Sequence, residues 1–172
     1  MKVLHLYSDW KWTGPAEPVL QMCWGLRERG HEVLLAHPPC PPYEGGENVA
    51  IKAAELNLPT TTRFALDRYG HPLPNLRDFF AIPRFLRDER FDILHMHLSH
   101  DHGLGGWCGR RLGRQAPLLV RTLHRRDVLP ATFLSRYLLR RLTDGWLTFT
   151  EGFRDEYVRR YRLPAGRVAV QP

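Results

Sequence analysis

The chain has 172 residues, of which 43% are hydrophobic, and its 25 Lys and Arg against 18 Asp and Glu give a net charge of +7. This length favours one domain with a full hydrophobic core. Three widely spaced cysteines without a C-x-x-C pair exclude a disulfide framework and a zinc knuckle. No apolar run approaches the roughly 20 residues of a membrane span, and the N-terminal stretch is too polar for a signal peptide. We therefore expect a soluble, cytoplasmic protein.

The positive charge has two interpretations. An arginine-rich surface attracts anionic partners such as nucleotide phosphates or the anionic inner face of a membrane, and it also occurs as plain solvated surface. The Arg residues are spread over many segments, and no RNP, zinc-finger or basic-zipper pattern is present. We expect no nucleic-acid partner, and peripheral contact with the inner face of the membrane stays an open alternative.

Apolar strands alternate with helical segments through the first half of the chain. We predict strands at 2–7, 31–37 and 60–66, and helices at 14–29, 47–56 and about 75–90. In chain order, the strand at 2–7, the helix at 14–29 and the strand at 31–37 form a βαβ unit, whose two strands are parallel. The proline-rich segment 38–46 predicts a loop, and Pro83 predicts a kink or a restart in the third helix.

The same alternation continues to the end of the chain. We predict strands at 91–96, 117–122, 145–149 and 167–170, and helices at about 104–113, 131–142 and 150–161. A polar, Gly-rich loop is expected between His97 and Gly106. The pattern predicts an α/β fold, a doubly wound parallel sheet in a Rossmann-like three-layer domain. With the strand order 3-2-1-4-5-6, the loops after strands one and four meet at one edge, where His124 and Thr150 also lie.

Three polar segments are candidate sites. Gly14, Pro15 and Glu17 open the first helix, whose N-terminus either binds an anion or is an ordinary helix start, since the G-x-G-x-x-G fingerprint is absent. His124 ends a strand and is followed by Arg125, so its imidazole is placed to contact a hydroxyl or a phosphate.

The third candidate is the run from His95 to His102, which reads H-M-H-L-S-H-D-H. It is similar to the H-x-H-x-D-H metal motif of metallo-β-lactamase-like hydrolases, in which clustered imidazoles bind zinc and activate water. Ser99 stands where that motif needs an Asp. We therefore expect no metal, and a metal-dependent hydrolase is kept as an alternative.

Five stretches together carry a resemblance to a known family. They are MKVLHLYSDW, GPAEPVLQMCWGLRERGHEVLLAH, FDILHMHLS, APLLVRTLH and TDGWLTFTEGFRDEYVRRYRLPAGRVAVQP. Their motifs, in this order, resemble the N-terminal domain of GT-B retaining glycosyltransferases of the family-4 type. The resemblance implies one half of a GT-B fold, which binds the sugar acceptor and forms one wall of a cleft.

The resemblance also implies roles for individual residues. His124, the histidine of a T-x-H motif, is the implied catalytic residue that approaches the transferred sugar. The residues implied to bind substrate are Gly14 and Pro15, which lie in the loop near the donor phosphates. His97 and the Thr150-Glu151 pair are implied to bind substrate as well. Pro15 replaces the usual second glycine and lacks its N–H. Catalysis in such enzymes is metal-independent, so no cofactor is expected.

In such enzymes the nucleotide-sugar site lies in a second Rossmann domain, for which 172 residues leave no room. We therefore expect residues 1–172 to form a single acceptor-binding domain, with the nucleotide-sugar domain absent. The chain alone is expected to be inactive and to meet a nucleotide-sugar only together with a second domain. A noncatalytic binding module is the other alternative.

Overall fold

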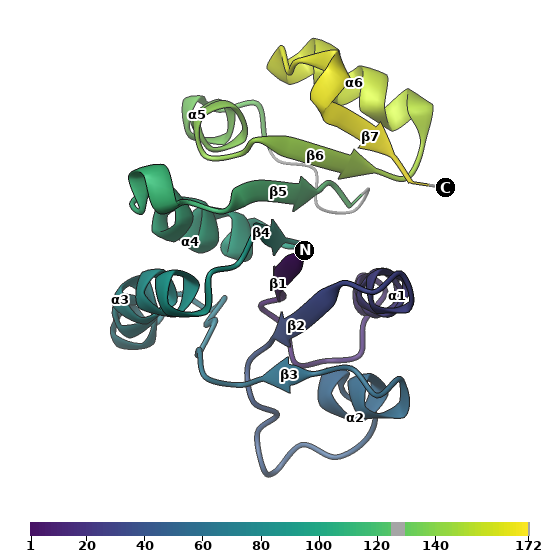
Figure 1. Ribbon diagram of the computed structural model, residues 1–172, viewed down its shortest axis with the longest axis vertical. Coiled ribbons are helices and arrows are strands. Elements are labelled where there is room, and N and C mark those ends of the chain that lie inside the picture. Colours follow the sequence, from purple (N-terminus) through teal and green to yellow (C-terminus); the bar gives the residue numbers. More distant parts are fainter. Residues whose placement is uncertain (125–129, 172) are drawn as a thin grey trace.

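The computed structural model describes residues 1–124 and 130–171. In this part of the chain, seven parallel strands form one sheet in the order β3-β2-β1-β4-β5-β6-β7 (Figure 1). The strands are β1 (Lys2–Leu6), β2 (Glu32–Ala36), β3 (Thr60–Thr61), β4 (Ile93–Met96), β5 (Leu118–Thr122), β6 (Gly145–Thr148) and β7 (Val168–Val170). The predicted strand order and the doubly wound α/β class are confirmed.

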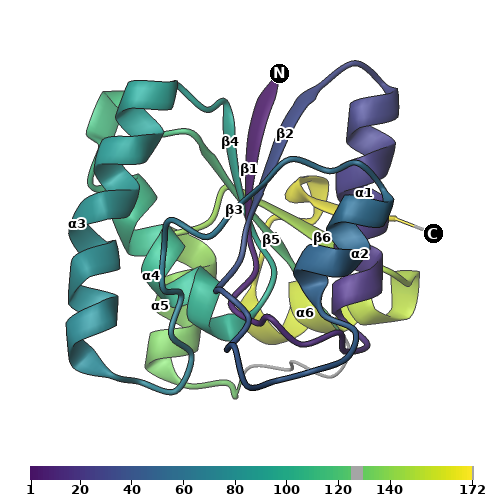
Figure 2. The ribbon, with the colours of Figure 1, turned by 90° about the horizontal axis from the view of Figure 1, so that it is seen from below.

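Helices cover both faces of the sheet and make three layers (Figure 2). The helices are α1 (Ala16–Glu28), α2 (Val49–Glu55), α3 (Pro72–Glu89), α4 (Ser99–Arg110), α5 (Phe133–Arg141) and α6 (Glu151–Tyr161). In both views α1, α2 and α6 lie on one face, called here the α1 face, and α3, α4 and α5 lie on the other, the α4 face. None of the helices in the described ranges is long and apolar enough to cross a membrane.

Alternation along the central strands divides the core between the two faces. On β1, Leu4 and Leu6 pack into the core of the α4 face, whereas Tyr7, which directly follows β1, belongs to the core that contacts α1. His5 has the opposite parity to Leu4 and Leu6, so its imidazole lies on the α1 face, next to its register partner His95 on β4. On β1, the side chains that face α4 are therefore apolar, whereas those that face α1 include the polar His5.

The third strand is shorter than the predicted 60–66 and ends at Thr61. The reason is the carboxylate of Asp78 on α3, which accepts hydrogen bonds from the backbone N–H groups of Ala65 (3.1 Å) and Leu66 (2.7 Å). These bonds replace a strand ladder and turn the chain, and Leu66 has a positive φ of 43°. The apolar side chains that suggested a strand are buried, but they pack against α3.

The expected loop between His97 and Gly106 is wrong, because α4 begins at Ser99. Asp101 lies in the first helical turn, and its carboxylate accepts hydrogen bonds from the backbone N–H groups of Leu98 (2.8 Å) and His97 (3.3 Å). An acidic residue at this position satisfies amides that the helix leaves open and complements the helix dipole. The polar residues mark a capped helix start.

The glycines of α4 allow the helix to approach its neighbours closely. A Cβ at Gly105 would lie 2.8 Å from Leu6 Cδ1, and one at Gly109 would lie 2.5 Å from Leu119 Cδ2. Gly106 meets Leu142 in the same way, with 3.1 Å to its Cβ. These glycines therefore serve packing inside a helix, in place of the loop that their frequency suggested.

The long helix α3 also departs from its predicted start and shape. It begins at Pro72, before the predicted start at about residue 75, and continues to Glu89. Pro83 lies inside the helix and is buried, without the restart that its sequence position suggested. Arg90, with a left-handed φ of 53°, ends the helix.

The close contact at Gly109 predicts a difference between two glycines of one helix. Gly109→Ala should lower the free energy of unfolding by about 1–3 kcal/mol, because the new methyl group overpacks Leu119. Gly103→Ala is the matched control: nothing lies within 4 Å of its Cβ position, and the substitution should stabilise the helix by about 0.5–1 kcal/mol. Urea denaturation of both variants measures the effect, and equal stability changes would contradict the packing account.

Candidate functional site

A cavity of about 480 Å³ lies where the chain leaves the carboxyl ends of β1 and β4. It is lined by Tyr7, Ser8, Asp9, Thr13, Pro15, Arg68, Leu98, Ser99, His100 and His124. Strands β1 and β4 are neighbours and their connections leave toward opposite faces, to α1 and to α4. A crevice at such a point is the usual ligand site of an open parallel sheet. We call this cavity the switch-point cavity.

The loop after β1 supplies most of the polar wall of the cavity. The hydroxyl groups of Tyr7 and Thr13 lie 3.2 Å apart, within hydrogen-bonding distance. The carboxylate of Asp9 is almost fully buried, accepts a hydrogen bond from the backbone N–H of Lys11 (3.1 Å) and forms an ion pair with Arg68. The side chain of Arg68 is 45% exposed, so it can also contact a ligand.

The N-terminal ends of two helices face the same cavity. Pro15 immediately precedes α1, and Ser99 and His100 form the start of α4. Helix N-termini carry a partial positive charge that favours electronegative groups. Pro15 supplies no N–H, so at α1 the dipole acts without a hydrogen bond from this residue.

His124, the predicted catalytic residue, lines the cavity just beyond the end of β5 and is 6% exposed. Its ring lies 5.6 Å from the ring of Phe149 and 6.1 Å from that of His97, measured between centroids. Phe149 follows β6, so the imidazole is held between groups from two neighbouring strand ends. Its packing limits the positions that the ring can take.

His97 is fully buried and does not line the switch-point cavity. Its ring packs beside that of His124. Burial lowers the pKa of His97 well below the usual value, and repulsion from the charged forms of His95 and His5 lowers it further. The neutral imidazole of His97 therefore packs against His124 on the side away from the cavity. Direct substrate contact by His97, as implied by the resemblance, stays a prediction that this geometry does not favour.

Asp101 lies under the cavity with its carboxyl group fully buried. Burial raises the pKa of this carboxyl to about 6, although the Ser8 hydroxyl, the Leu98 amide and the Arg121 guanidinium each act to lower it. Arg121, on β5, is itself fully buried. The buried charged residues Asp101 and Arg121 therefore lie beneath the loop that holds Ser8 and beneath the start of α4.

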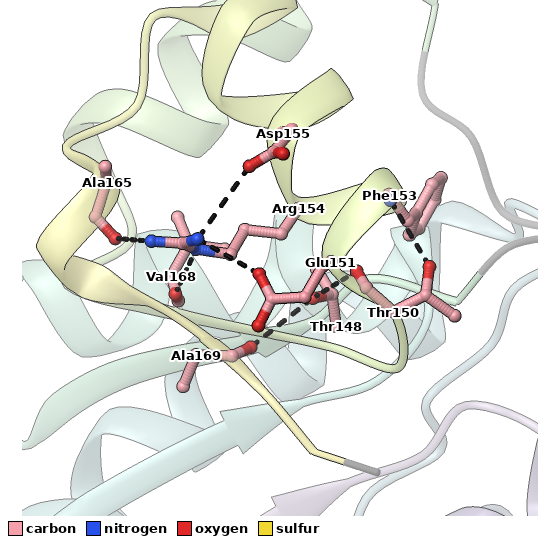
Figure 3. Close-up of polar contacts among 9 residues, drawn as sticks. All are labelled: Thr148, Thr150, Glu151, Phe153, Arg154, Asp155, Ala165, Val168 and Ala169. Atoms are coloured by element: carbon pink, nitrogen blue, oxygen red, sulfur yellow. Dashed lines mark hydrogen bonds and ion pairs between the residues drawn. The ribbon is translucent and has the colours of Figure 1, made fainter.

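Thr150 and Glu151 lie at the start of α6 (Figure 3), at the same edge of the sheet. They line no part of the switch-point cavity. The Thr150 hydroxyl caps α6 by accepting a hydrogen bond from the N–H of Phe153 (3.2 Å), and the Glu151 carboxylate contacts Arg154 (3.1 Å). Arg154 also donates to the carbonyl of Val168 (3.1 Å), which ties α6 to β7. In this structure both predicted residues fix the start of α6.

The remaining predicted residues divide into three cases. Gly14 and Glu17 are exposed around the start of α1, and Glu17 lies in its first turn. Arg125 lies outside the described residues. Ser8, Asp9 and Arg68 were not among the predicted site residues; the first two directly follow a buried strand, which is a usable signal, whereas Arg68 is 59 residues away from its partner Asp9.

The run His95–His102 does not converge on one point. His102 lies on α4, where its Nε2 is 2.7 Å from the Thr143 hydroxyl, while Asp101 caps the helix and His100 faces the switch-point cavity. Within the described ranges, the group of side chains close enough to share a metal ion is His5, His95 and His97. The proposed hydrolase motif is therefore not formed.

Comparisons with known proteins agree on the class. The fold is one half of a GT-B fold, and the family model described as Glycosyltransferase Family 4 matches residues 13–172. The chain belongs to Glycosyltransferase Family 4. A comparison with curated protein sequences finds no match.

Solved structures share the fold at low sequence identity. A glycosyltransferase from Rickettsia africae has a TM-score of 0.74 and 12% identity, over 98% of this chain and 42% of its own. MurG of Acinetobacter baumannii has a TM-score of 0.61 and 16% identity, over 88% and 42%. The UDP-GlcNAc 2-epimerase of Methanocaldococcus jannaschii, in complex with UDP-GlcNAc and UDP, has a TM-score of 0.68 and 16% identity, over 99% and 46%. This chain spans less than half the length of each.

The buried histidines predict how stability depends on pH. Burial lowers the pKa of His102 from 6.5 to about 3, so the unfolded chain binds this proton more tightly than the folded chain between these values. Stability from His102 is fully present above pH 6.5 and is lost as the pH falls, by about 1.4 kcal/mol per pH unit. His102→Gln should reduce the pH slope of the unfolding free energy between pH 6 and 4 by this amount.

The control for this prediction is His31→Gln, at a partly exposed position before β2, and the measurement is urea denaturation at a series of pH values. An unchanged slope in His102→Gln would contradict the burial argument. The raised pKa of Asp101 acts in the opposite direction, because its folded form binds a proton more tightly between about pH 4 and 6. Asp101 is present in all three proteins, so its contribution cancels in the comparison.

Proposed function

We propose that this chain is the acceptor-binding half of a glycosyltransferase that transfers a sugar from a nucleotide-sugar to a glycan, lipid-linked or small-molecule acceptor. Family membership supports the reaction class. The observation that carries the proposal is the switch-point cavity, which places His124 in one space with an ion pair and two hydroxyl groups. We place the protein in the cytoplasm.

The chemistry of the cavity wall suits a carbohydrate. Sugar hydroxyls both donate and accept hydrogen bonds, and the Asp9 carboxylate accepts while the Arg68 guanidinium donates. Tyr7 and Thr13 each offer a hydroxyl group that can do both. Charge-assisted bonds from the Asp9–Arg68 pair would be the strongest of these contacts.

His124 is the residue we assign to the reacting end of the acceptor. Its ring lies at the cavity wall and is packed by Phe149 and His97. From this position the imidazole can hydrogen-bond a sugar hydroxyl and hold it toward the donor. The positive ends of α1 and α4 face the same space and would stabilise negative charge that develops there.

We propose that the donor site belongs to a second domain outside these 172 residues. The solved structures that share this fold are more than twice as long as the part they share with this chain. Transfer would therefore need both domains, and the residues described here would bind the acceptor alone. Gly14, Glu17, Thr150 and Glu151 lie on or near the edge that would face the donor.

Sugar binding by the chain tests this proposal. Titration calorimetry with methyl glycosides of glucose, galactose, mannose and N-acetylglucosamine should find at least one sugar that binds. His124→Ala should weaken that sugar about tenfold, which corresponds to about 1.4 kcal/mol for one lost hydrogen bond and its packing. Asp9→Asn should also weaken it, because the ion pair with Arg68 loses its charge.

The matched control is His31→Ala, a histidine outside the switch-point cavity, whose affinity should equal that of the original chain. Thermal unfolding confirms that each variant is folded. Equal affinities of the original chain and His124→Ala, or sugar transfer from UDP-GlcNAc by the chain alone, would contradict the proposal. Absence of binding by every sugar would favour a noncatalytic binding module.

We further propose that the chain contacts an anionic membrane through α3. Three apolar side chains on this helix are exposed, Leu73 (77%), Leu76 (55%) and Phe80 (51%). They recur at helical spacing with the exposed Arg77 and Arg84. We call these five residues the α3 stripe. Apolar side chains flanked by arginines are typical of helices that lie on anionic lipid surfaces.

Vesicle sedimentation tests the role of the α3 stripe. Phe80→Ser should reduce binding to vesicles of phosphatidylglycerol and phosphatidylcholine about tenfold, because a large apolar side chain no longer enters the lipid. Ile51→Ser is the control: Ile51 is 46% exposed on α2, which lies on the other face of the sheet. Equal losses in both variants, or no vesicle binding by the original chain, would refute the membrane proposal.

A further inference from the structure

Three imidazoles from the two central strands meet on the α1 face of the sheet. His5 on β1 and His95 on β4 are register partners, and His97 follows β4 with the same parity as His95. The ring centroids are 4.9 Å apart for His5 and His95, 4.3 Å for His95 and His97, and 5.2 Å for His5 and His97. One nitrogen from each ring lies within 4.8 Å of the others. We call these residues the histidine triad.

The triad carries more polar groups than its surroundings satisfy. His5 Nδ1 and His97 Nε2 lie 2.9 Å apart and share one hydrogen bond, and His95 Nε2 lies 2.7 Å from the Thr122 hydroxyl. His5 Nε2 and His97 Nδ1 are buried without a hydrogen-bond partner among the described residues. Since each neutral imidazole has one N–H and one lone pair, one of these two nitrogens is an unpaired donor and the other an unpaired acceptor.

Unpaired buried polar groups are rare in proteins and call for an explanation such as a bound water or ion. Three such rings at the centre of a sheet, where apolar side chains would pack well, are costly unless a ligand uses them. Burial holds the pKa of His5 at about 3 and those of His95 and His97 well below 6.5. The three rings are therefore neutral at physiological pH, which is the protonation state that binds metal ions.

A second cavity, separate from the switch-point cavity, reaches His95 of the triad. It has a volume of about 520 Å³, lies between α1 and the uncovered part of the sheet, and includes His95 in its wall. Its other lining groups from the sheet are apolar: Val3, Ile93, Val120 and Leu147. His95 is thus the polar side chain among those that the sheet contributes to this cavity, and the cavity has room for a water molecule next to it.

We propose that the histidine triad is a binding site for a divalent transition-metal ion, with Zn²⁺ as the ion of choice and water from this second cavity as the fourth ligand. Imidazole nitrogens suit Zn²⁺, and three histidines with one open position are an established donor set. Tetrahedral bonds of about 2.1 Å place the ligand nitrogens roughly 3.4 Å apart. The present spacing therefore requires ring rotations that move the nitrogens by about 1–2 Å and break the His5–His97 hydrogen bond.

Thr122 is the residue that would orient the site. When His95 binds the ion through Nδ1, its Nε2–H donates to the Thr122 hydroxyl, which fixes the tautomer and the ring orientation. The ion would also lock His97, whose ring contacts His124 in the switch-point cavity. The site has no carboxylate and lies inside the sheet, so we assign it a structural role. It does not depend on the proposed sugar transfer.

Metal analysis of the purified chain tests this inference. The protein is produced without a histidine tag, stripped with a chelator, dialysed against Zn²⁺ and analysed for bound metal. We expect one Zn²⁺ per chain, a higher unfolding temperature with Zn²⁺, and the visible absorption of a tetrahedral site with Co²⁺. His95→Gln should weaken Zn²⁺ binding at least 100-fold, and the unfolding temperature should no longer respond to the ion.

His102→Gln is the matched control, because His102 is a buried histidine that pairs with Thr143 outside the triad, and it should keep one Zn²⁺. Thr122→Val keeps all three ligands and the side-chain volume, and it should weaken Zn²⁺ binding about 10-fold. This variant decides the question if His95→Gln does not fold. A folded chain that stays metal-free, or full affinity in Thr122→Val and in folded His95→Gln, would overturn the proposal.

Discussion

The parallel pairing of β1 with β4 at the centre of the sheet is the constraint on which the other features depend. It aligns His5 with His95 inside the molecule, and it brings the loop that carries Ser8 beside the start of α4. The two connections leave toward opposite faces of the sheet. A cavity therefore opens at this edge, as general rules for open parallel sheets require.

The two faces of the sheet bury different kinds of side chains against their helices. On the α4 face, apolar side chains and glycines of α4 bring helix and sheet into close contact, as Gly109 does against Leu119. On the α1 face, imidazoles fill positions that apolar groups could occupy. Polar groups in a core cost stability and persist where function or a ligand uses them. The histidine triad fits that rule, and so do the buried Asp101 and Arg121.

The sequence predicted the α/β class, the strand order and the place of His124 at a strand end, because hydrophobic periodicity and short connections determine them. It did not predict that Asp101 caps a helix, because a polar, Gly-rich segment looks the same in a loop and at a helix start. It also missed the Asp9–Arg68 pair and the contact of His5 with His97, whose partners are 59 and 92 residues apart. Such contacts depend on tertiary packing, which local pattern does not encode.

Amide chemical-shift mapping of the isotope-labelled chain with a bound methyl glycoside tests the central claim most directly. The account predicts that the largest shifts fall on Tyr7, Ser8, Thr13, Ser99 and His100, around the switch-point cavity. Shifts confined to the amino ends of the strands, or to the cavity between α1 and the sheet, would contradict it. Either of those results would mean that the carboxyl edge of this sheet is not where the acceptor binds.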